Sequence, residues 1–206
     1  MSSDRDSILA RVNAALKPLP KRAPLPAWDD ELVVLRQARG DIADPWALFA
    51  ERLRAVNGTP LTAVADLVAL LKKSNWSHGY CDPALWERLR PDFAAAGGFT
   101  VETVFDRTRV DDYHFGITRS VGAIAETGTI ILGDTTTANR LSALAPWVHV
   151  ALVEPARIFT DLTQAVAAFG QDPNIIWCTG PSKTADVEGI LIEGVHGPGV
   201  QVALRA

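Results

Sequence analysis

One carboxylate in an otherwise apolar stretch is the first feature of this sequence that could do chemistry. Residues 116–132 read GITRSVGAIAETGTIIL, and Glu126 stands at the turn between two short apolar segments. Because ligands gather at strand ends in α/β sheets, Glu126 could serve as a nucleophile, a general base or an acceptor for a substrate hydroxyl. The structural alternative is a tight turn that Glu126 caps and in which Gly128 supplies a positive φ.

Two glycine-punctuated loops near the C-terminus form a second candidate, within residues 180–199, GPSKTADVEGILIEGVHGPG. The first loop is expected to follow a strand and to enter a short helical turn over 185–188. Its free backbone N–H groups, helped by Lys183, would then suit a phosphate or a carboxylate. Alternatively, Asp186 and Glu188 complement the helix dipole, and the loop is a cap that needs no ligand.

The second loop presents a histidine. Three glycines and a proline constrain residues 194–199, and His196 lies in their middle, so it is the histidine that we favour for catalysis or binding. His78 and His114 have less distinctive surroundings. His149 lies inside an apolar strand, where a hydrogen-bonded core histidine is the usual finding.

A single arginine completes the candidates. Arg140 could clamp a carboxylate or phosphate through its planar guanidinium, or it could pair with an acidic residue at the surface. No two histidines are spaced so that they could bind one metal ion from the same face of a helix, and no cysteine lies close to them in sequence. We therefore predict no metal site. The sequence also lacks the P-loop pattern and GxGxxG, which argues against an ordinary nucleotide site.

Hydrophobic periodicity indicates the elements that must position these residues. Apolar residues three and four apart predict helices over 7–16, 45–53, 62–71 and 82–89, with Asp82 as the cap and Pro83 in the first turn of the last of these. A further helix is expected over 158–169, capped by Thr160. β-Branched and apolar runs predict strands over 99–105, 123–125, 129–132, 148–153, 175–178 and 201–204. Helices interleaved with strands favour a layered α/β domain.

Composition limits the classes of protein. The 206 residues, 48% of them hydrophobic, suffice for one sizeable core, and we expect an N-terminal helix and extended arm over 1–44 before a domain over 45–206. The net charge of −4 argues against duplex nucleic acid as a partner. Two separated cysteines are too few for a disulfide framework or an iron–sulfur site, which fits a reducing cytoplasm. No apolar run is long enough to span a bilayer, so we expect no membrane insertion.

Three stretches together carry a family resemblance. GITRSVGAIAETGTIIL, RLSALAPWVHVALV and GPSKTADVEGILIEGVHGPG resemble, in order and spacing, the lactate utilization protein C family, whose single module is called the LUD domain. The resemblance covers residues 45–206. It implies a Rossmann-like three-layer α/β fold with a central, mostly parallel sheet, similar to the sugar-phosphate isomerase and CoA-transferase fold. The positions that match the family's motifs are Glu126, Thr127, Gly128, Thr129, Arg140, Ser182, Lys183, Thr184, Asp186, Gly194, His196, Gly197 and Gly199. Of these, we expect Glu126 and His196 to be catalytic and the others, apart from Gly199, to bind an anion or substrate.

The resemblance also implies a function. The chain would be a subunit, without an iron–sulfur cluster of its own, of a cytoplasmic system that oxidises L-lactate to pyruvate. It would supply a small-anion or organic-acid pocket and would act with an iron–sulfur partner and a cysteine-rich partner. Iron–sulfur clusters are expected in those partners, and no cofactor is expected to be bound by this chain itself. The alternatives are an independent enzyme acting on a small phosphorylated or CoA-linked acid, in which Glu126 does covalent work, and a purely structural scaffold. In the first two cases, the acidic turn and both late loops should meet around a small cavity at one rim of a single sheet.

Overall fold

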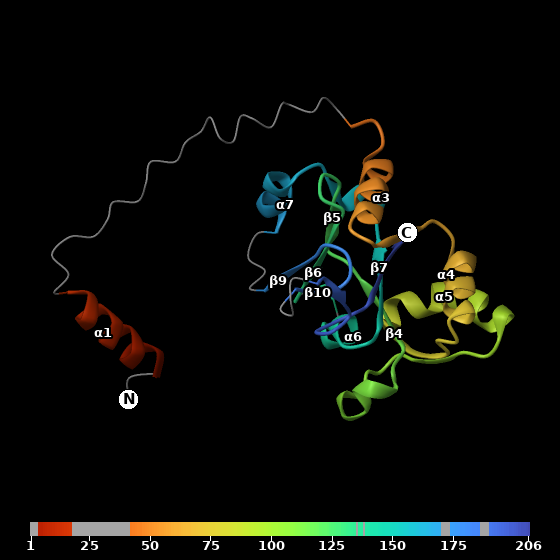
Figure 1. Ribbon diagram of the computed structural model, residues 1–206, viewed down its shortest axis with the longest axis horizontal. Helices are drawn as coiled ribbons and strands as arrows, with labels where there is room; N and C mark the ends of the chain where they lie inside the picture. The colour runs from red at the N-terminus through yellow and green to blue at the C-terminus, as the bar shows by residue number, and fades with distance from the viewer. Residues whose placement is uncertain (1–3, 18–41, 135, 138, 170–173, 186–189) are drawn as a thin grey trace. The chain divides into compact units, whose positions relative to one another are not determined.

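The computed structural model describes residues 4–17, 42–134, 136–137, 139–169, 174–185 and 190–206, in two units, Met1–Asp41 and Ile42–Ala206 (Figure 1). In the first unit, α1 (Asp4–Leu16) covers the helix predicted over 7–16 and buries none of its side chains. The greater part of the predicted arm lies outside the described residues.

A six-stranded sheet forms the centre of the second unit. Every neighbouring pair of strands is parallel, and the order is β1 (Thr59–Leu61), β12 (Val200–Arg205), β7 (Val148–Val153), β4 (Phe115–Arg119), β2 (His78–Cys81), β3 (Thr100–Glu102). All six residues of β7 are buried, as a parallel strand covered on both faces requires. The predicted α/β fold with a central, mostly parallel sheet is therefore confirmed.

Helices α4 (Val64–Lys73) and α5 (Pro83–Ala96) cover one face of this sheet. Leu67, Leu71 and Leu89 project from the two helices into the core and are fully buried there. Helix α5 begins as predicted, because the Asp82 carboxylate accepts a hydrogen bond from the backbone N–H of Ala84 at 2.9 Å.

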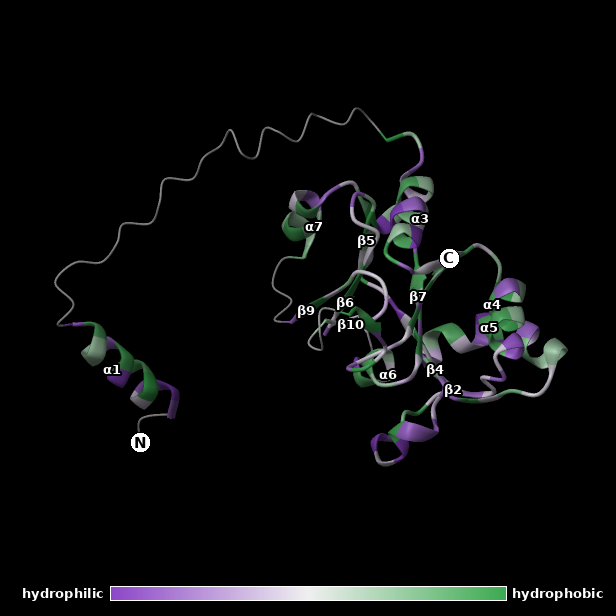
Figure 2. Cartoon of the chain, in the orientation of Figure 1, coloured by the Kyte–Doolittle hydropathy of each residue, from purple (hydrophilic) through white to green (hydrophobic). Residues whose placement is uncertain are grey.

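The opposite face of the six-stranded sheet is covered by α3 (Pro45–Ala55) and by a second sheet (Figure 1). The strands of that second sheet, in spatial order, are β8 (Ile158–Phe159), β5 (Gly122–Ile124), β6 (Thr129–Gly133) and β9 (Ile175–Cys178). Phe49 and Leu53 of α3 pack against small residues such as Ala151 and Ala203, which let the layers approach closely. Figure 2 colours β6 and β7, which flank this interface, largely as hydrophobic.

Several elements differ from the predicted ones. Residues 158–169, predicted as one helix, form β8 and the shorter α7 (Leu162–Ala168), because Ile158 and Phe159 pair with β5. Asp161 rather than Thr160 caps α7, accepting a hydrogen bond from the N–H of Gln164 at 2.9 Å. The remaining elements are α6 (Leu141–Leu144), the short 3₁₀ helices η1 (Arg107–Asp112) and η2 (Pro155–Arg157), and a hairpin of β10 (Lys183–Thr184) with β11 (Ile192–Glu193).

Among the described residues, none of the helices combines the length and the apolar character that crossing a bilayer demands.

Candidate functional site

A pocket of about 440 Å³ lies where β4, β7 and β12 begin. Its lining comes from three segments, within 110–114, 144–147 and 194–197, each of which leads into one of these strands. Because neighbouring parallel strands begin at the same edge of a sheet, the loops that precede them gather there. We call this hollow the amino-edge pocket.

Glycines allow the second late loop to lie on an indole ring. A Cβ added at Gly199 would lie 2.3 Å from Cζ2 of Trp147, and one added at Gly194, whose φ is +81°, would lie 2.5 Å from Cζ3. The loop can therefore press on Trp147 only if both positions lack side chains. His196 lines the pocket from this loop and is exposed, as we expected of a presented histidine.

The two late loops are joined to each other by backbone hydrogen bonds. The N–H of Ser182 donates to the carbonyl oxygen of Pro198, and the N–H of Gly194 donates to the carbonyl oxygen of Ser182, both at 2.9 Å. A Cβ at Gly197 would lie 3.2 Å from Cβ of Ser182. The structure thus brings Ser182, Gly194, His196 and Gly197 together beside one pocket.

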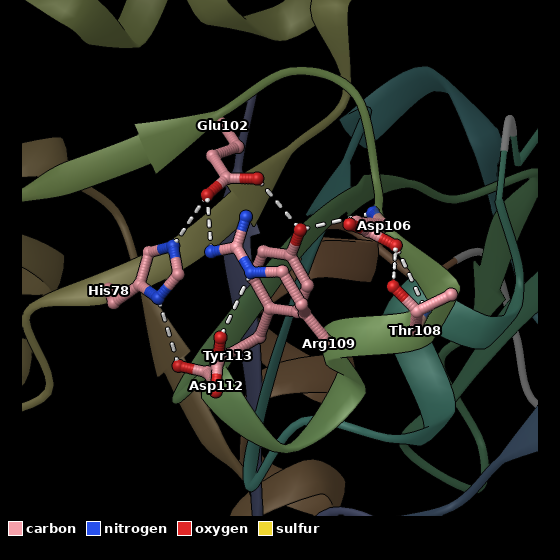
Figure 3. Close-up of polar contacts among 7 residues, drawn as sticks. All are labelled: His78, Glu102, Asp106, Thr108, Arg109, Asp112 and Tyr113. Atoms are coloured by element: carbon pink, nitrogen blue, oxygen red, sulfur yellow. Dashed lines mark hydrogen bonds and ion pairs between the residues drawn. The ribbon is translucent and has the colours of Figure 1, made fainter.

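A polar network holds the wall of the pocket that η1 and the residues after it provide (Figure 3). The Glu102 carboxylate, at the end of β3, accepts hydrogen bonds from the Tyr113 hydroxyl at 2.8 Å, His78 Nε2 at 2.9 Å and Arg109 Nη2 at 3.1 Å. Arg109 also pairs with Asp112 at 3.0 Å. The hydrogen bonds from Tyr113, His78 and Arg109 lower the pKa of Glu102.

Tyr113 is the buried centre of this wall. Its ring stacks on Phe105 with centroids 4.7 Å apart, and its hydroxyl accepts a hydrogen bond from the backbone N–H of Asp106 at 3.0 Å. Burial, followed by the Glu102 contact, raises the pKa of Tyr113, so its hydroxyl stays protonated and donates to Glu102.

His114 is a pocket residue that sequence reasoning passed over. Its ring Nδ1 accepts a hydrogen bond from the backbone N–H of His78 at 3.2 Å. The backbone N–H of His114 in turn donates to the carbonyl oxygen of His78 at 2.8 Å. The two histidines stand at the beginnings of adjacent strands, with Gly79 opposite Phe115 in the register. The available signal was positional: His78 is the first residue of β2, and His114 directly precedes β4.

The acidic turn belongs to the other sheet. Residues 125–128 connect β5 to β6, and Glu126 is half-buried, with its N–H donating to the carbonyl oxygen of Thr160 at 3.1 Å. Gly128 has a φ of +66°, as the structural alternative required, and an added Cβ would lie 2.4 Å from the backbone nitrogen of Leu53 in α3. The hydroxyls of Thr127, Thr129 and Thr179 form a chain with steps of 2.7 and 2.8 Å.

The expectation of convergence at one rim of a single sheet is therefore wrong. The stretch 116–132 crosses from the six-stranded sheet to the four-stranded sheet after Arg119, so the hairpin that carries Glu126 leaves the sheet that β12 belongs to. Glu126 does not line the pocket that His196 lines. The first late loop connects the two regions, because Thr179 contacts Thr129 while Ser182 contacts the second loop. Catalytic roles for Glu126 and His196 stay predictions.

Lys183 and Arg140, the two basic residues predicted to bind an anion, form ion pairs with other residues of the chain. Nζ of Lys183 donates to the carbonyl oxygen of Val56 at 3.0 Å and lies 3.5 Å from the Glu193 carboxylate, and Thr184 follows in β10. Arg140 pairs with Asp134 at 2.7 Å, which is the surface alternative considered for it. Asp186 and the predicted helical turn at 185–188 fall mostly outside the described residues.

His149 is a core residue, as predicted. It is fully buried in β7 on the face toward the second sheet, with Nε2 2.9 Å from the Thr118 hydroxyl and Nδ1 3.0 Å from the Gln201 side-chain amide. Burial lowers the pKa of His149 to about 4. Within the described part of the chain, no group of three His, Cys, Asp or Glu side chains is arranged to hold a metal ion.

Three known proteins are similar to this chain in sequence. Lactate utilization protein C from Bacillus licheniformis is 34% identical over 113 residues, which are 51% of this chain and 45% of that protein. The Bacillus subtilis protein of the same name is 35% identical over 98 residues, covering 44% of this chain and 41% of the relative. The chain thus spans less than half the length of these two relatives. An uncharacterized protein from Neisseria meningitidis is 25% identical over 178 residues, or 74% of this chain and 76% of that protein.

A solved structure and a family model complete the comparison. The crystal structure of a DUF162 family protein from Deinococcus radiodurans superposes with a TM-score of 0.52 at 21% identity, covering 79% of this chain and 96% of that one. The model of the LUD domain matches residues 89–202, which contain every segment that lines the amino-edge pocket. The chain belongs to the LUD domain family.

Proposed function

We propose that this chain acts in lactate utilization and that it binds a small carboxylic acid in the amino-edge pocket. The observation that carries the proposal is the identity of 34–35% with two proteins named lactate utilization protein C. The matched domain includes all three loops that form the pocket. A hollow of about 440 Å³ is ample for an acid of the size of lactate.

The redox centres of such a system would lie in partner proteins. This chain has two cysteines, whereas an iron–sulfur cluster needs about four thiolate ligands. Cys81 packs in the core beneath α4 and α5, and Cys178 packs against the opposite core beneath α3. Burial raises the pKa of Cys81 to about 12 and that of Cys178 to about 11, which disfavours the thiolate form that ligates metals. Following the resemblance to the lactate utilization protein C family, we propose an iron–sulfur protein and a cysteine-rich protein as partners.

A reconstitution assay tests this role. Lactate-dependent reduction of a dye would be measured with the two partner proteins alone, with the wild-type chain added, and with His196→Ala added. We expect the wild-type chain to raise the rate and His196→Ala to raise it less, because His196 lines the pocket. Val104→Ala, which truncates a side chain that is 80% exposed and lies outside the pocket, is the matched control and should behave as wild type.

Two outcomes would contradict the proposal. A rate that does not respond to the chain would remove the role in lactate utilization. Turnover of a sugar phosphate or a CoA ester by the isolated chain, with lactate oxidation unaffected, would instead support an independent enzyme.

A further inference from the structure

We infer that His114 is a second ligand-binding residue of the amino-edge pocket, where its Nε2–H recognises the carboxylate of a small hydroxy acid. The inference deepens the proposed function and rests on it for the choice of ligand. It begins from the hydrogen bond between the backbone N–H of His78 and Nδ1 of His114, at 3.2 Å.

This hydrogen bond selects one tautomer of the ring. A backbone N–H can only donate, so Nδ1 of His114 must be the acceptor and must lack a proton. In the neutral ring the proton is then on Nε2, which becomes a donor. His114 lines the pocket and is exposed, so a ligand can reach that donor.

The partner of His114 is itself held in place. The His78 ring contacts the Glu102 carboxylate through Nε2 at 2.9 Å and the carbonyl oxygen of Asp112 through Nδ1 at 3.0 Å (Figure 3). The backbone of His78 also belongs to β2, which pairs with β4 directly after His114. The orientation of His114 is thus fixed before a ligand arrives, which reduces the entropy lost on binding.

The rest of the pocket defines the class of ligand. His114 and His196 stand on separate loops and can both contact a carboxylate, while Asp111 supplies the one carboxylate among the lining residues. Asp111 can accept a hydrogen bond from a ligand hydroxyl but repels a second acidic group. A donor for an acid group beside an acceptor for a hydroxyl suits a monocarboxylic hydroxy acid.

Two substitutions separate binding of the ligand by Nε2–H of His114 from the hydrogen bond that Nδ1 accepts from the backbone N–H of His78. The side-chain oxygen of Asn in His114→Asn can replace Nδ1 as the acceptor for the His78 N–H, but this variant has no donor at the position of Nε2. The longer amide of His114→Gln can place a donor near that position and lacks the Nδ1 acceptor. If His114 binds the ligand, His114→Asn should weaken binding of L-lactate by at least about tenfold, and His114→Gln should retain more of the affinity.

Titration calorimetry of the full chain with L-lactate and with neutral propane-1,2-diol measures the affinities. Long-range ¹H–¹⁵N correlation of the wild-type histidine rings measures the tautomer directly, and His114→Asn identifies the His114 signals. We expect L-lactate to bind more tightly than the diol, and the His114 ring to carry its proton on Nε2.

The inference is overturned by a proton on Nδ1, by equal affinities for L-lactate and the diol, or by wild-type affinity in His114→Asn. These results would leave the reconstitution assay unaffected, because that assay measures the role in lactate oxidation. Conversely, a chain that binds L-lactate through His114 but does not stimulate lactate oxidation would refute the proposed role in lactate utilization alone.

Discussion

Lowering the pH from 7 to 5 should destabilise this protein through one buried histidine. His149 is fully buried, and burial lowers its pKa to about 4 from an ordinary value of 6.5. Above pH 6.5 the ring is neutral in both the folded and the unfolded chain, and it adds no pH dependence. Between pH 6.5 and 4 the unfolded chain binds a proton that the folded chain excludes, so the free energy of unfolding falls as the pH falls.

The size of the effect follows from the two pKa values. Each pH unit inside this window costs about 1.4 kcal/mol, and the full change from pH 7 to pH 5 comes to about 2 kcal/mol. That is a substantial part of the stability of a typical domain, roughly 5–15 kcal/mol. Glu102, whose pKa is lowered from 4.5, is present in both wild type and His149→Gln, so its contribution cancels when the two are compared.

Urea unfolding of wild type and His149→Gln at pH 7 and pH 5 measures the effect. The variant has no titrating ring, so its loss of stability between the two pH values should be smaller than that of wild type by about 2 kcal/mol. Thr118→Val removes the hydroxyl 2.9 Å from Nε2 and serves as the control, because it weakens the core yet keeps the titrating ring. Equal pH dependence in wild type and His149→Gln would refute the reasoning.

Two further predictions concern the walls of the pocket. Glu102→Gln should remove the part of the stability that wild type loses as the pH falls below 4.5 through the lowered pKa of this carboxyl. Acid unfolding monitored by circular dichroism measures this loss. Identical unfolding profiles of wild type and variant would contradict a role for Glu102 in holding Tyr113. Gly199→Ala should displace Trp147, change its fluorescence and weaken ligand binding, because the new Cβ would lie 2.3 Å from the ring. Gly197→Ala, with a nearest contact of 3.2 Å to Ser182, is the matched control for the fluorescence and should change it less.

Long periodic segments made most of the fold predictable. The helix predicted over 45–53 is α3 (Pro45–Ala55), and the apolar run over 148–153 is β7, because burial on one face or on both leaves a clear pattern. The short strands β1, β2 and β4 were not predicted, although β5, β6 and β9 of similar length were. β1 contains Pro60, which an edge strand tolerates, and β2 reads HGYC, whose pairing depends on strands far away in sequence.

The candidate site was predictable only in part, since sequence proximity and spatial proximity differ here. The glycines around His196 indicated a constrained loop, and this loop does line a pocket. The link between His78 and His114 depends on the parallel register of β2 and β4 across 36 residues of sequence, which no local pattern encodes. Glu126 was grouped with His196 because the crossing between the two sheets leaves no mark in the apolar run.

The topology also accounts for a pocket at the amino edge of the sheet, although ligands of open α/β sheets usually bind at the carboxyl edge. At the carboxyl ends of β2 and β4, Asp82 caps α5 and pairs with Arg119 at 2.9 Å, so both charges are used by the fold. The chain then continues from β4 into the second sheet, with the Ser120 hydroxyl donating to the carbonyl oxygen of Leu152 at 2.8 Å. Helix and sheet contacts thus engage these polar side chains at the carboxyl ends of β2 and β4. Two of the loops at the amino edge return the chain from the second sheet to β7 and β12, and together with the loop before β4 they hold two histidines, an aspartate and an indole around an open hollow.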